Sequence, residues 1–398
     1  PYTMNKLILF PCFLFIINTI NAQEGKKEYL QKVLNKIEKI ESASYYNVSK
    51  TWEPGDTIPL SEYRQLINEY NNPADSTIGA SYIALEPDDT KKLAFGYDGH
   101  VGSHMFHDKK GIMIDDFTTR PLPFRLVGPP FFNYTKSIIR YALNTNDNIT
   151  TELKEEKDYY YFKLVINEDK QVEFFGKDYK IDNPYCLDPT SGYEIWISKS
   201  NDLPYQVRRE MYHNISMNTC SDVEINKLSI SDFKLSDYFP KDYEIRKVGE
   251  NRAAPTSSLV GQKATAWTLK DEKEQDISLS DFKSKVLLVQ FTGIGCGPCQ
   301  LSIPFLNKLK SEFKTDALDI VAIETWRRKA HALQNYIDRH HINYKLTTGT
   351  DEIVKAYQAS SAPIFFILDE NRVIRKIVTG YSKDSTDKDI ENYIKELL

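Results

Sequence analysis

Positive charge is not in excess in this chain. Its 398 residues include 51 lysines and arginines against 56 aspartates and glutamates, which gives a net charge of −5. The 25 tyrosines and 20 phenylalanines are spread along the chain and are not set among basic clusters. This pattern gives no reason to expect a nucleic-acid partner. The composition, 41% hydrophobic and 27% charged residues, is typical of a globular protein with two domains.

Long apolar runs are nearly absent as well. The main one, from Leu7 to Ile17, follows the basic start Met4-Asn5-Lys6 and is too short to span a bilayer comfortably. A basic start, a short apolar core and the small residue Ala22 predict a secretory signal peptide over residues 1–22. An uncleaved N-terminal anchor is the alternative. Because no second long apolar run follows, we expect the mature protein to be soluble and exported.

Cysteine is scarce, yet two of the five cysteines stand three residues apart. The sequence Cys296-Gly297-Pro298-Cys299 follows the apolar run Val286–Phe291. No further Cys or His follows at the usual distance, which argues against a zinc ribbon or an iron–sulfur site. No metal and no cofactor are therefore expected. A strand before the pair and a helix after it favour redox chemistry.

The position of this pair at a helix start predicts different roles for its two thiols. Cys296 would sit at the helix N-terminus, where unpaired backbone N–H groups and the helix dipole favour the thiolate. Pro298 would lie in the first turn, where its missing N–H has no cost. Cys299 would lie one turn inside, ready to attack a mixed disulfide. A purely structural disulfide is the alternative.

A second motif lies downstream at Ser361-Ala362-Pro363. It is followed by the apolar run Ile364–Leu368, a turn, and a partner strand predicted from Val373 to Val378. A proline cannot donate a hydrogen bond to a sheet, so Pro363 is expected at the first position of its strand.

With these motifs, residues from about 255 to 398 resemble the TlpA/ResA-like branch of the thioredoxin family. The matching pieces are Val260–Ala264, Leu279–Lys283, the strand Val286–Phe291, Cys296–Cys299, Pro304, Ala362-Pro363 and Gly380-Tyr381. The resemblance implies an α/β fold with a central mixed sheet flanked by helices, and thiol–disulfide oxidoreductase activity. In that family the proline that matches Pro363 is cis and faces the disulfide. The resemblance therefore implies a substrate surface formed by Ala362, Pro363, Gly297 and Pro298.

The chain departs from this family pattern at several positions. Relatives usually carry tryptophan where this chain has Gly295 and Thr292. Thioredoxins place a buried aspartate at the position of Gln290, and relatives in this branch often have glutamate at the position of Ser302. Glu324, at the end of the apolar stretch 320–323, remains as a candidate acid/base. A solvated residue at a strand end is the favoured interpretation of Glu324.

The region before the C-terminal third predicts a different fold. Leu30, Val33, Leu34, Ile37 and Ile40 recur at helical spacing, which predicts an amphipathic helix over 24–43. Strands are predicted over 81–85, 92–97, 159–165, 192–197 and 205–212, with a short helix near 135–143. We expect a mainly antiparallel, curved sheet beside a helix, loosely similar to LolA-like half-barrels and of unknown role. The predicted domains are 24–248 and 259–398, with a linker over 249–258.

Two further groups of residues in this region leave alternatives open. Cys186 and Cys220 lie at nearly equal distances from the turn near residue 203, so an antiparallel hairpin would bring them together as a structural disulfide. Two separate free thiols are the alternative. His100, His104 and His107 form a cluster with two aspartates nearby, for which solvated loop or strand residues are the default interpretation and metal binding is the alternative.

The leading hypothesis is an exported, periplasmic thiol–disulfide oxidoreductase. The resemblance implies that it reduces a disulfide-containing substrate protein with electrons from a membrane donor. A peroxiredoxin-like peroxidase is one alternative, although Gly293 stands where that chemistry needs threonine. The other alternative is a protein that binds a lipid or another hydrophobic ligand in its N-terminal sheet, with an accessory redox domain.

Overall fold

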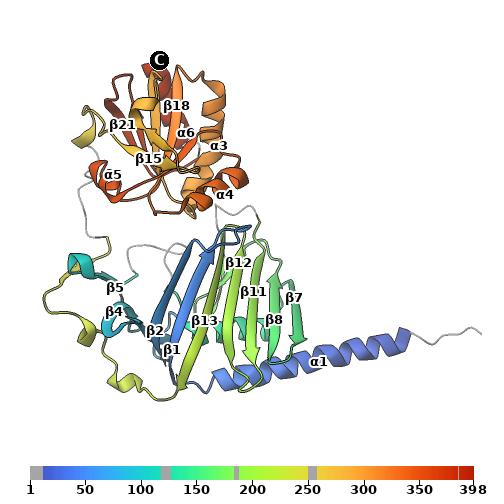
Figure 1. The fold of residues 1–398 in the computed structure, drawn as a ribbon. Helices are drawn as coiled ribbons and strands as arrows, with labels where there is room; N and C mark the ends of the chain where they lie inside the picture. Colours follow the sequence, from blue (N-terminus) through green and yellow to red (C-terminus); the bar gives the residue numbers. More distant parts are fainter. Residues whose placement is uncertain (1–11, 118–126, 183–187, 250–257, 384) are drawn as a thin grey trace, which may run out of the picture. The chain divides into compact units, whose positions relative to one another are not determined.

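The computed structural model describes residues 12–117, 127–182, 188–249, 258–383 and 385–398. These residues form two compact units (Figure 1). The first unit contains most of the described residues up to Gly249. The second contains the described residues from Ser258 onward together with an early segment, Trp52–Leu60.

The first unit is built on a 12-stranded sheet in its described part. The strand order is β14-β6-β5-β4-β3-β2-β1-β13-β12-β11-β8-β7 (Figure 1). Its strands are β1 (Ser42–Trp52), β2 (Ser61–Asn71), β3 (Ala80–Glu86), β4 (Asp89–Tyr97), β5 (Gly102–Phe106), β6 (Gly111–Asp115), β7 (Ile149–Glu155), β8 (Tyr159–Ile166), β11 (Ser191–Ser198), β12 (Pro204–Met211), β13 (Asn214–Ile225) and β14 (Glu244–Lys247). A separate hairpin consists of β9 (Gln171–Phe174) and β10 (Asp178–Ile181).

Two helices pack with this sheet. In α1 (Cys12–Ile37), Leu30, Val33, Leu34 and Ile37 are buried. Helix α2 (Phe131–Asn144) buries Phe131, Phe132, Ile138 and Ile139 in the same core as the alternating inward residues of β8 and β11. A buried carboxylate holds the start of α2, because Glu69 on β2 accepts the backbone N–H groups of Phe132 and Asn133 at 3.0 and 2.7 Å. This satisfies helix-terminal donors that have no partner within the helix.

The mainly antiparallel sheet beside a helix confirms the predicted fold class of this region. The five predicted strands correspond to β3, β4, β8, β11 and β12, and the predicted short helix corresponds to α2. The helix predicted over 24–43 was too long at its C-terminal end, since α1 ends at Ile37 and β1 begins at Ser42. The helix also begins at Cys12, inside the segment predicted to be a signal peptide.

The second unit contains a seven-stranded mixed sheet in the described residues, with the order β16-β15-β19-β18-β17-β20-β21. Its elements are β15 (Thr268–Asp271), β16 (Asp276–Ser278), β17 (Val286–Thr292), α3 (Gly297–Glu312), β18 (Leu318–Glu324), α4 (Ala330–His340), β19 (Lys345–Thr348), α5 (Asp351–Ala356), β20 (Ile364–Leu368), β21 (Ile374–Thr379) and α6 (Ser385–Leu397). This confirms the predicted α/β fold, a central mixed sheet with helices.

Strand β17 is an interior strand of this sheet, between β18 and β20, and is buried along its whole length. Val286 and Leu288 face one hydrophobic cluster, which includes residues of α3, α4 and α6. Leu287, Val289 and Phe291 face the other cluster, which includes Ile353 of α5. Because both faces are covered, the strand appears in the sequence as an uninterrupted apolar run.

The pairing of β17 brings the two sequence motifs to one edge of the sheet. Strand β17 runs parallel to β18, with Thr292 opposite Glu324, and antiparallel to β20, with Phe291 opposite Ile364. The end of β17, which leads into α3, therefore meets the beginning of β20. The segment that carries Cys296 and the residue before Ile364, Pro363, lie at this common edge.

One segment departs from the predicted domain ranges. Trp52–Leu60, the connection between β1 and β2, lies inside the predicted range 24–248 but groups with the second unit. Contacts between residues so far apart in the sequence leave no local pattern. Most of the predicted linker, residues 250–257, lies outside the described residues.

Candidate active site

Cys296 and Cys299 form a disulfide at the start of α3, with their Cα atoms 5.2 Å apart. Cys296 is the N-cap residue, and its sulfur accepts the backbone N–H of Cys299 at 3.3 Å. Pro298 lies in the first turn, where no N–H is needed. The exposed fraction is 7% for Cys296 and 1% for Cys299. Cys296 is thus the more exposed residue of the pair, and its sulfur is the one that the helix terminus would stabilise as a thiolate.

The predicted substrate surface gathers around this sulfur. The carbonyl oxygen of Ala362 lies 3.7 Å from the Sγ atom of Cys296. The Ala362–Pro363 peptide bond is cis, and the carbonyl of Pro363 accepts the N–H of Gly380 at 2.8 Å. Gly297 and Pro298 are partly exposed beside the disulfide. The structure therefore brings all four predicted substrate-binding residues to the same place.

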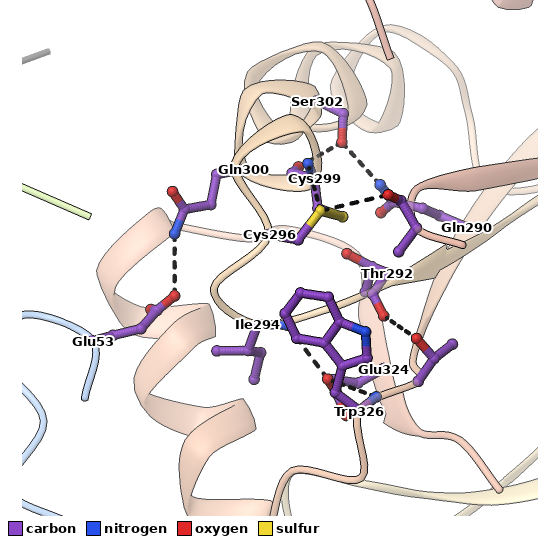
Figure 2. Close-up of a disulfide and its surroundings, with 12 residues drawn as sticks. Glu53, Gln290, Thr292, Ile294, Cys296, Cys299, Gln300, Ser302, Glu324 and Trp326 are labelled. Atoms are coloured by element: carbon purple, nitrogen blue, oxygen red, sulfur yellow. Dashed lines mark hydrogen bonds between the residues drawn. A yellow bond between two sulfur atoms is a disulfide. The ribbon is translucent and has the colours of Figure 1, made fainter. Parts of the chain in front are cut away.

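Gln290 and Ser302, two of the departures from the family pattern, are hydrogen-bonded to each other (Figure 2). The Nε2 atom of Gln290 donates to the hydroxyl of Ser302 at 2.8 Å, and this hydroxyl donates to the carbonyl of Cys299 at 2.7 Å. Both side chains are buried. A neutral amide–hydroxyl pair therefore lies next to Cys299, at two of the positions where the sequence departs from the pattern that the family resemblance implies.

The hydrogen bond between Gln290 and Ser302 is expected to contribute to the stability of the protein. Ser302→Ala would leave the buried Gln290 amide without an acceptor, and we expect a loss of about 2 kcal/mol in the free energy of unfolding. The double variant Gln290→Leu/Ser302→Ala removes both partners and should lose less than the sum of the single variants, by about 1 kcal/mol. Urea unfolding of the four proteins measures this coupling, and simple additivity would contradict the prediction.

The favoured interpretation of Glu324 as a solvated strand-end residue was wrong. Glu324 is fully buried and lies at the end of β18. Its Oε1 atom accepts the backbone N–H groups of Ile294 and Trp326 at 3.4 and 3.0 Å, and its Oε2 atom accepts that of Arg328 at 2.9 Å. Burial raises the pKa of this carboxyl, against the opposing effect of these hydrogen bonds. Because Ile294 lies two residues before Cys296, Glu324 holds the loop that carries the first cysteine.

The raised pKa of Glu324 predicts a pH-dependent stability. A carboxyl whose pKa is higher in the folded state contributes fully at low pH, and this contribution is lost as the pH rises through the folded-state pKa. The unfolding free energy of the wild type minus that of Glu324→Gln should therefore decrease as the pH rises from below 4.5. The fall is about 1.4 kcal/mol for each unit of pKa difference. A difference that is constant or grows with pH would show that burial does not outweigh the hydrogen bonds in setting the pKa of Glu324.

Two residues near the disulfide were missed from the sequence. Trp326, directly after β18, lies beside the loop 293–295, with 46% of its surface exposed (Figure 2). Glu53, from the segment Trp52–Leu60, accepts a hydrogen bond from the Nε2 atom of Gln300 at 3.1 Å (Figure 2). No motif marks either residue. An isolated tryptophan in a polar connection was the only available sequence signal for Trp326.

Glu53 belongs to a buried ion-pair cluster. Its side chain is 1% exposed and pairs with Arg339 of α4, which also pairs with Asp56. Asn335 donates to Asp56 at 3.1 Å, and the backbone carbonyl of Leu60 accepts from Arg328 at 2.9 Å. The segment Trp52–Leu60 is therefore fixed by charge and hydrogen bonds to α4 and to the residue after Cys299.

The candidate disulfide between Cys186 and Cys220 is not present at Cys220. Cys220 is a free, buried thiol, and burial raises its pKa to about 12. Cys186 lies outside the described residues. The prediction counted residues outward from the turn near residue 203 and took Cys220 to lie on the strand that follows this turn. However, β12 lies between β11 and β13, the strand of Cys220.

Two of the three clustered histidines, His104 and His107, have structural partners, and His100 is exposed. The two ring nitrogens of His107 lie 2.8 Å from the Tyr243 hydroxyl and 2.7 Å from the Leu93 carbonyl oxygen. The ring of His104 packs on Phe95 with centroids 4.6 Å apart. Within the ranges that the structure describes, no group of three or more His, Cys, Asp or Glu residues is placed to hold a metal ion.

The mixed sheet of the second unit, with a dithiol at a helix start and a cis-proline at the same edge, defines the thioredoxin class. Comparison with known proteins agrees: residues 259–394 match the model of the Redoxin family. Thiol-disulfide oxidoreductase ResA from Bacillus subtilis (strain 168) is 30% identical over 144 residues, which cover 36% of this chain and 80% of that protein. ResA from Geobacillus kaustophilus (strain HTA426) is 27% identical with the same coverages. Through its C-terminal third, the chain belongs to the ResA-like branch of the thioredoxin family.

Among solved structures, the thioredoxin domain of a thiol-disulfide oxidoreductase from Bacteroides vulgatus matches at 26% identity. It covers 34% of this chain and 97% of that domain, with a TM-score of 0.30. A thiol:disulfide interchange protein from a Bacteroides species matches at 25% identity, 34% and 90% coverage and a TM-score of 0.31. The Redoxin match covers residues 259–394, so the loose resemblance of the first unit to LolA-like half-barrels stays a prediction.

Proposed function

We propose that this protein reduces disulfides of other proteins outside the cytosol, with Cys296 as the nucleophile and Cys299 as the resolving thiol. The observation that carries the proposal is the position of the Cys296 sulfur. It caps α3, accepts the Cys299 N–H at 3.3 Å and lies 3.7 Å from the Ala362 carbonyl. A thiolate there is favoured by the helix terminus and lies beside the backbone of Ala362 and Pro363, which the family resemblance implies pairs with an extended substrate.

The reaction proceeds by two thiol–disulfide exchanges. The Cys296 thiolate attacks one sulfur of the substrate disulfide, and the other substrate sulfur leaves and takes a proton. The thiolate of Cys299 then attacks the Cys296 sulfur of the mixed disulfide, which releases the second substrate sulfur. Two electrons pass to the substrate, and the protein is left with the Cys296–Cys299 disulfide. A dithiol donor, which we place in the membrane, must reduce it again.

Export is part of the proposal, because a disulfide reductase finds stable substrate disulfides mainly outside the cytosol. The sequence of residues 1–22, with its basic start and short apolar core, supports a secretory signal and a periplasmic location. In the described ranges, no helix is long and apolar enough to cross a membrane.

The direction of electron flow is tested by the reduction potential of the Cys296/Cys299 pair. The potential is measured by equilibration against dithiothreitol or glutathione. The Cys186→Ser/Cys220→Ser background removes two other thiols, so that the Cys296/Cys299 pair is the couple that is measured. We expect a potential near about −270 mV, as in thioredoxin. A potential near about −120 mV, as in strong oxidants, would overturn the reductase proposal in favour of disulfide formation.

A cavity in the first unit favours a second candidate function, the binding of a hydrophobic ligand. This cavity of about 590 Å³ has aromatic walls that include Tyr82, Phe95 and Tyr134. The Oδ1 atom of Asn47, which lines the cavity, has no hydrogen-bond partner among the described residues. The size and lining suit a small amphipathic molecule with an N–H or O–H donor.

The neutral aromatic amine N-phenyl-1-naphthylamine provides a probe for this cavity. Saturable fluorescence enhancement with the full chain, weakened by Ala94→Trp, which would fill the cavity, would support ligand binding. An absence of saturation, or equal binding by the variant, would exclude it.

A further inference from the structure

The loop between β17 and α3 lies against the indole of Trp326. A Cβ atom at Gly293 would lie 2.7 Å from the Cδ2 and Cε2 atoms of this indole, closer than non-bonded atoms can approach. A Cβ atom at Gly295 would lie 3.9 Å from its Cζ3 atom. The absence of a side chain at Gly293 therefore allows the ring to lie directly on the backbone that leads to Cys296 (Figure 2).

Hydrogen bonds fix the segment of Trp326 to the same loop. One atom, Oε1 of the buried Glu324, accepts the N–H groups of both Ile294 and Trp326. The N–H and the hydroxyl of Thr325 both donate to the carbonyl of Thr292, at 2.9 and 3.0 Å. The backbone on which the indole is mounted is thus joined to the backbone of the active-site loop on both sides of Gly293.

Trp326 is nevertheless 46% exposed, although its backbone is held by hydrogen bonds and its ring lies against the loop. The guanidinium carbon of Arg328 lies over this ring, 5.8 Å from its centroid. A large aromatic surface held in one position binds a partner with little loss of side-chain freedom, which is why tryptophan is enriched among the residues that dominate interfaces.

We infer that Trp326 is a specificity-determining residue, which contacts an apolar side chain adjacent to the reacting cysteine of a substrate protein. This rests on the proposed disulfide exchange at Cys296. The family resemblance places a tryptophan directly before the first cysteine, where this chain has Gly295. Here the aromatic surface comes from the connection after β18. The partner is therefore an extended segment in which the cysteine is flanked by an aromatic or aliphatic residue.

Two disulfide-linked peptides that differ only in Phe or Ser next to the cysteine test this inference. The reduced full-length protein should react about fivefold faster with the Phe peptide, the rate equivalent of one aromatic contact. Trp326→Ala should abolish this preference, and Trp326→Phe should retain most of it. Bis(2-hydroxyethyl) disulfide, which has no flanking side chain, should react at the same rate with all three proteins.

Two further variants separate docking from a general effect on the site. Gly293→Ala keeps the indole but displaces it, so this variant should also weaken the preference. Val260→Ala removes an apolar side chain of similar exposure, 47%, from the same unit and should leave the preference intact. The reduction potential should be unchanged in Trp326→Ala.

Three outcomes decide the question. An undiminished Phe/Ser preference in Trp326→Ala would overturn the role of Trp326. An equal slowing of all three disulfides would also overturn it, because the indole would then act on the reactivity of Cys296. A wild-type protein that reacts with none of them would instead refute the proposed function itself.

Discussion

Cys296→Ser is expected to abolish reduction of a protein disulfide, whereas Cys299→Ser is expected to accumulate a covalent mixed disulfide. The first variant lacks the sulfur at the N-terminus of α3, and turnover of insulin should fall at least about a thousandfold. The second keeps that sulfur but lacks the thiol that resolves the intermediate. Turbidity of reduced insulin measures turnover, and mass spectrometry under non-reducing conditions detects the mixed disulfide.

Cys220→Ser serves as the control for these variants. Its thiol is buried in the first unit and its pKa is raised, so we expect unchanged turnover. A mixed disulfide that accumulates on Cys296→Ser through Cys299 would reverse the assigned roles. Retention of activity by both single variants would refute the dithiol mechanism.

Arg339→Met is expected to destabilise the second unit by about 3 kcal/mol. The substitution leaves the buried carboxylates of Glu53 and Asp56 without their cation, and an uncompensated buried charge is costly. Because Arg339 is itself 25% exposed, part of this cost is screened by solvent. Urea unfolding of the oxidised full chain measures the change, and the transition that shifts on reduction of the disulfide identifies the second unit.

Arg327→Ala provides the matched comparison in the same unit. Arg327 pairs with Asp351, but both side chains are about two-thirds exposed, at 66% and 67%. The loss in the free energy of unfolding caused by Arg327→Ala should therefore stay below about 1 kcal/mol. Equal effects of the two substitutions would mean that Trp52–Leu60 contributes little to this unit.

The sheet edge that carries the disulfide could be predicted because its determinants are local. The run Val286–Phe291 is apolar at every position, which identifies a strand covered on both faces. A cysteine pair directly after it marks the helix start. Pro363 marks the start of a neighbouring strand, which begins one residue later than predicted, at Ile364. The antiparallel register between β17 and β20 then follows from the fold, and it places the two motifs together.

The other parts of the site depend on contacts that sequence patterns do not encode. In the sequence, Glu324 is a residue at the end of an apolar strand. The structure shows that it is buried and that its carboxylate accepts three backbone N–H groups from two loops. Gln290 and Ser302 were noticed as departures, but their hydrogen bond joins a strand to a helix. The pairing proposed for Cys220 failed for a related reason, since strand order cannot be counted from a single turn.

The location of Trp52–Leu60 determines where in the sequence the second unit begins. The family match starts at residue 259, yet Gln300, Asn335 and Arg339 find their acceptors in residues 53 and 56. A protein cut before Ser258 would keep both cysteines but lose these acceptors. The second unit is therefore discontinuous in the sequence. It is complete only when two stretches of chain separated by about two hundred residues have come into contact. Insertions or truncations near β1 and β2 would then alter the surroundings of the disulfide through the contact between Glu53 and Gln300, although the sequence around the cysteines is unchanged.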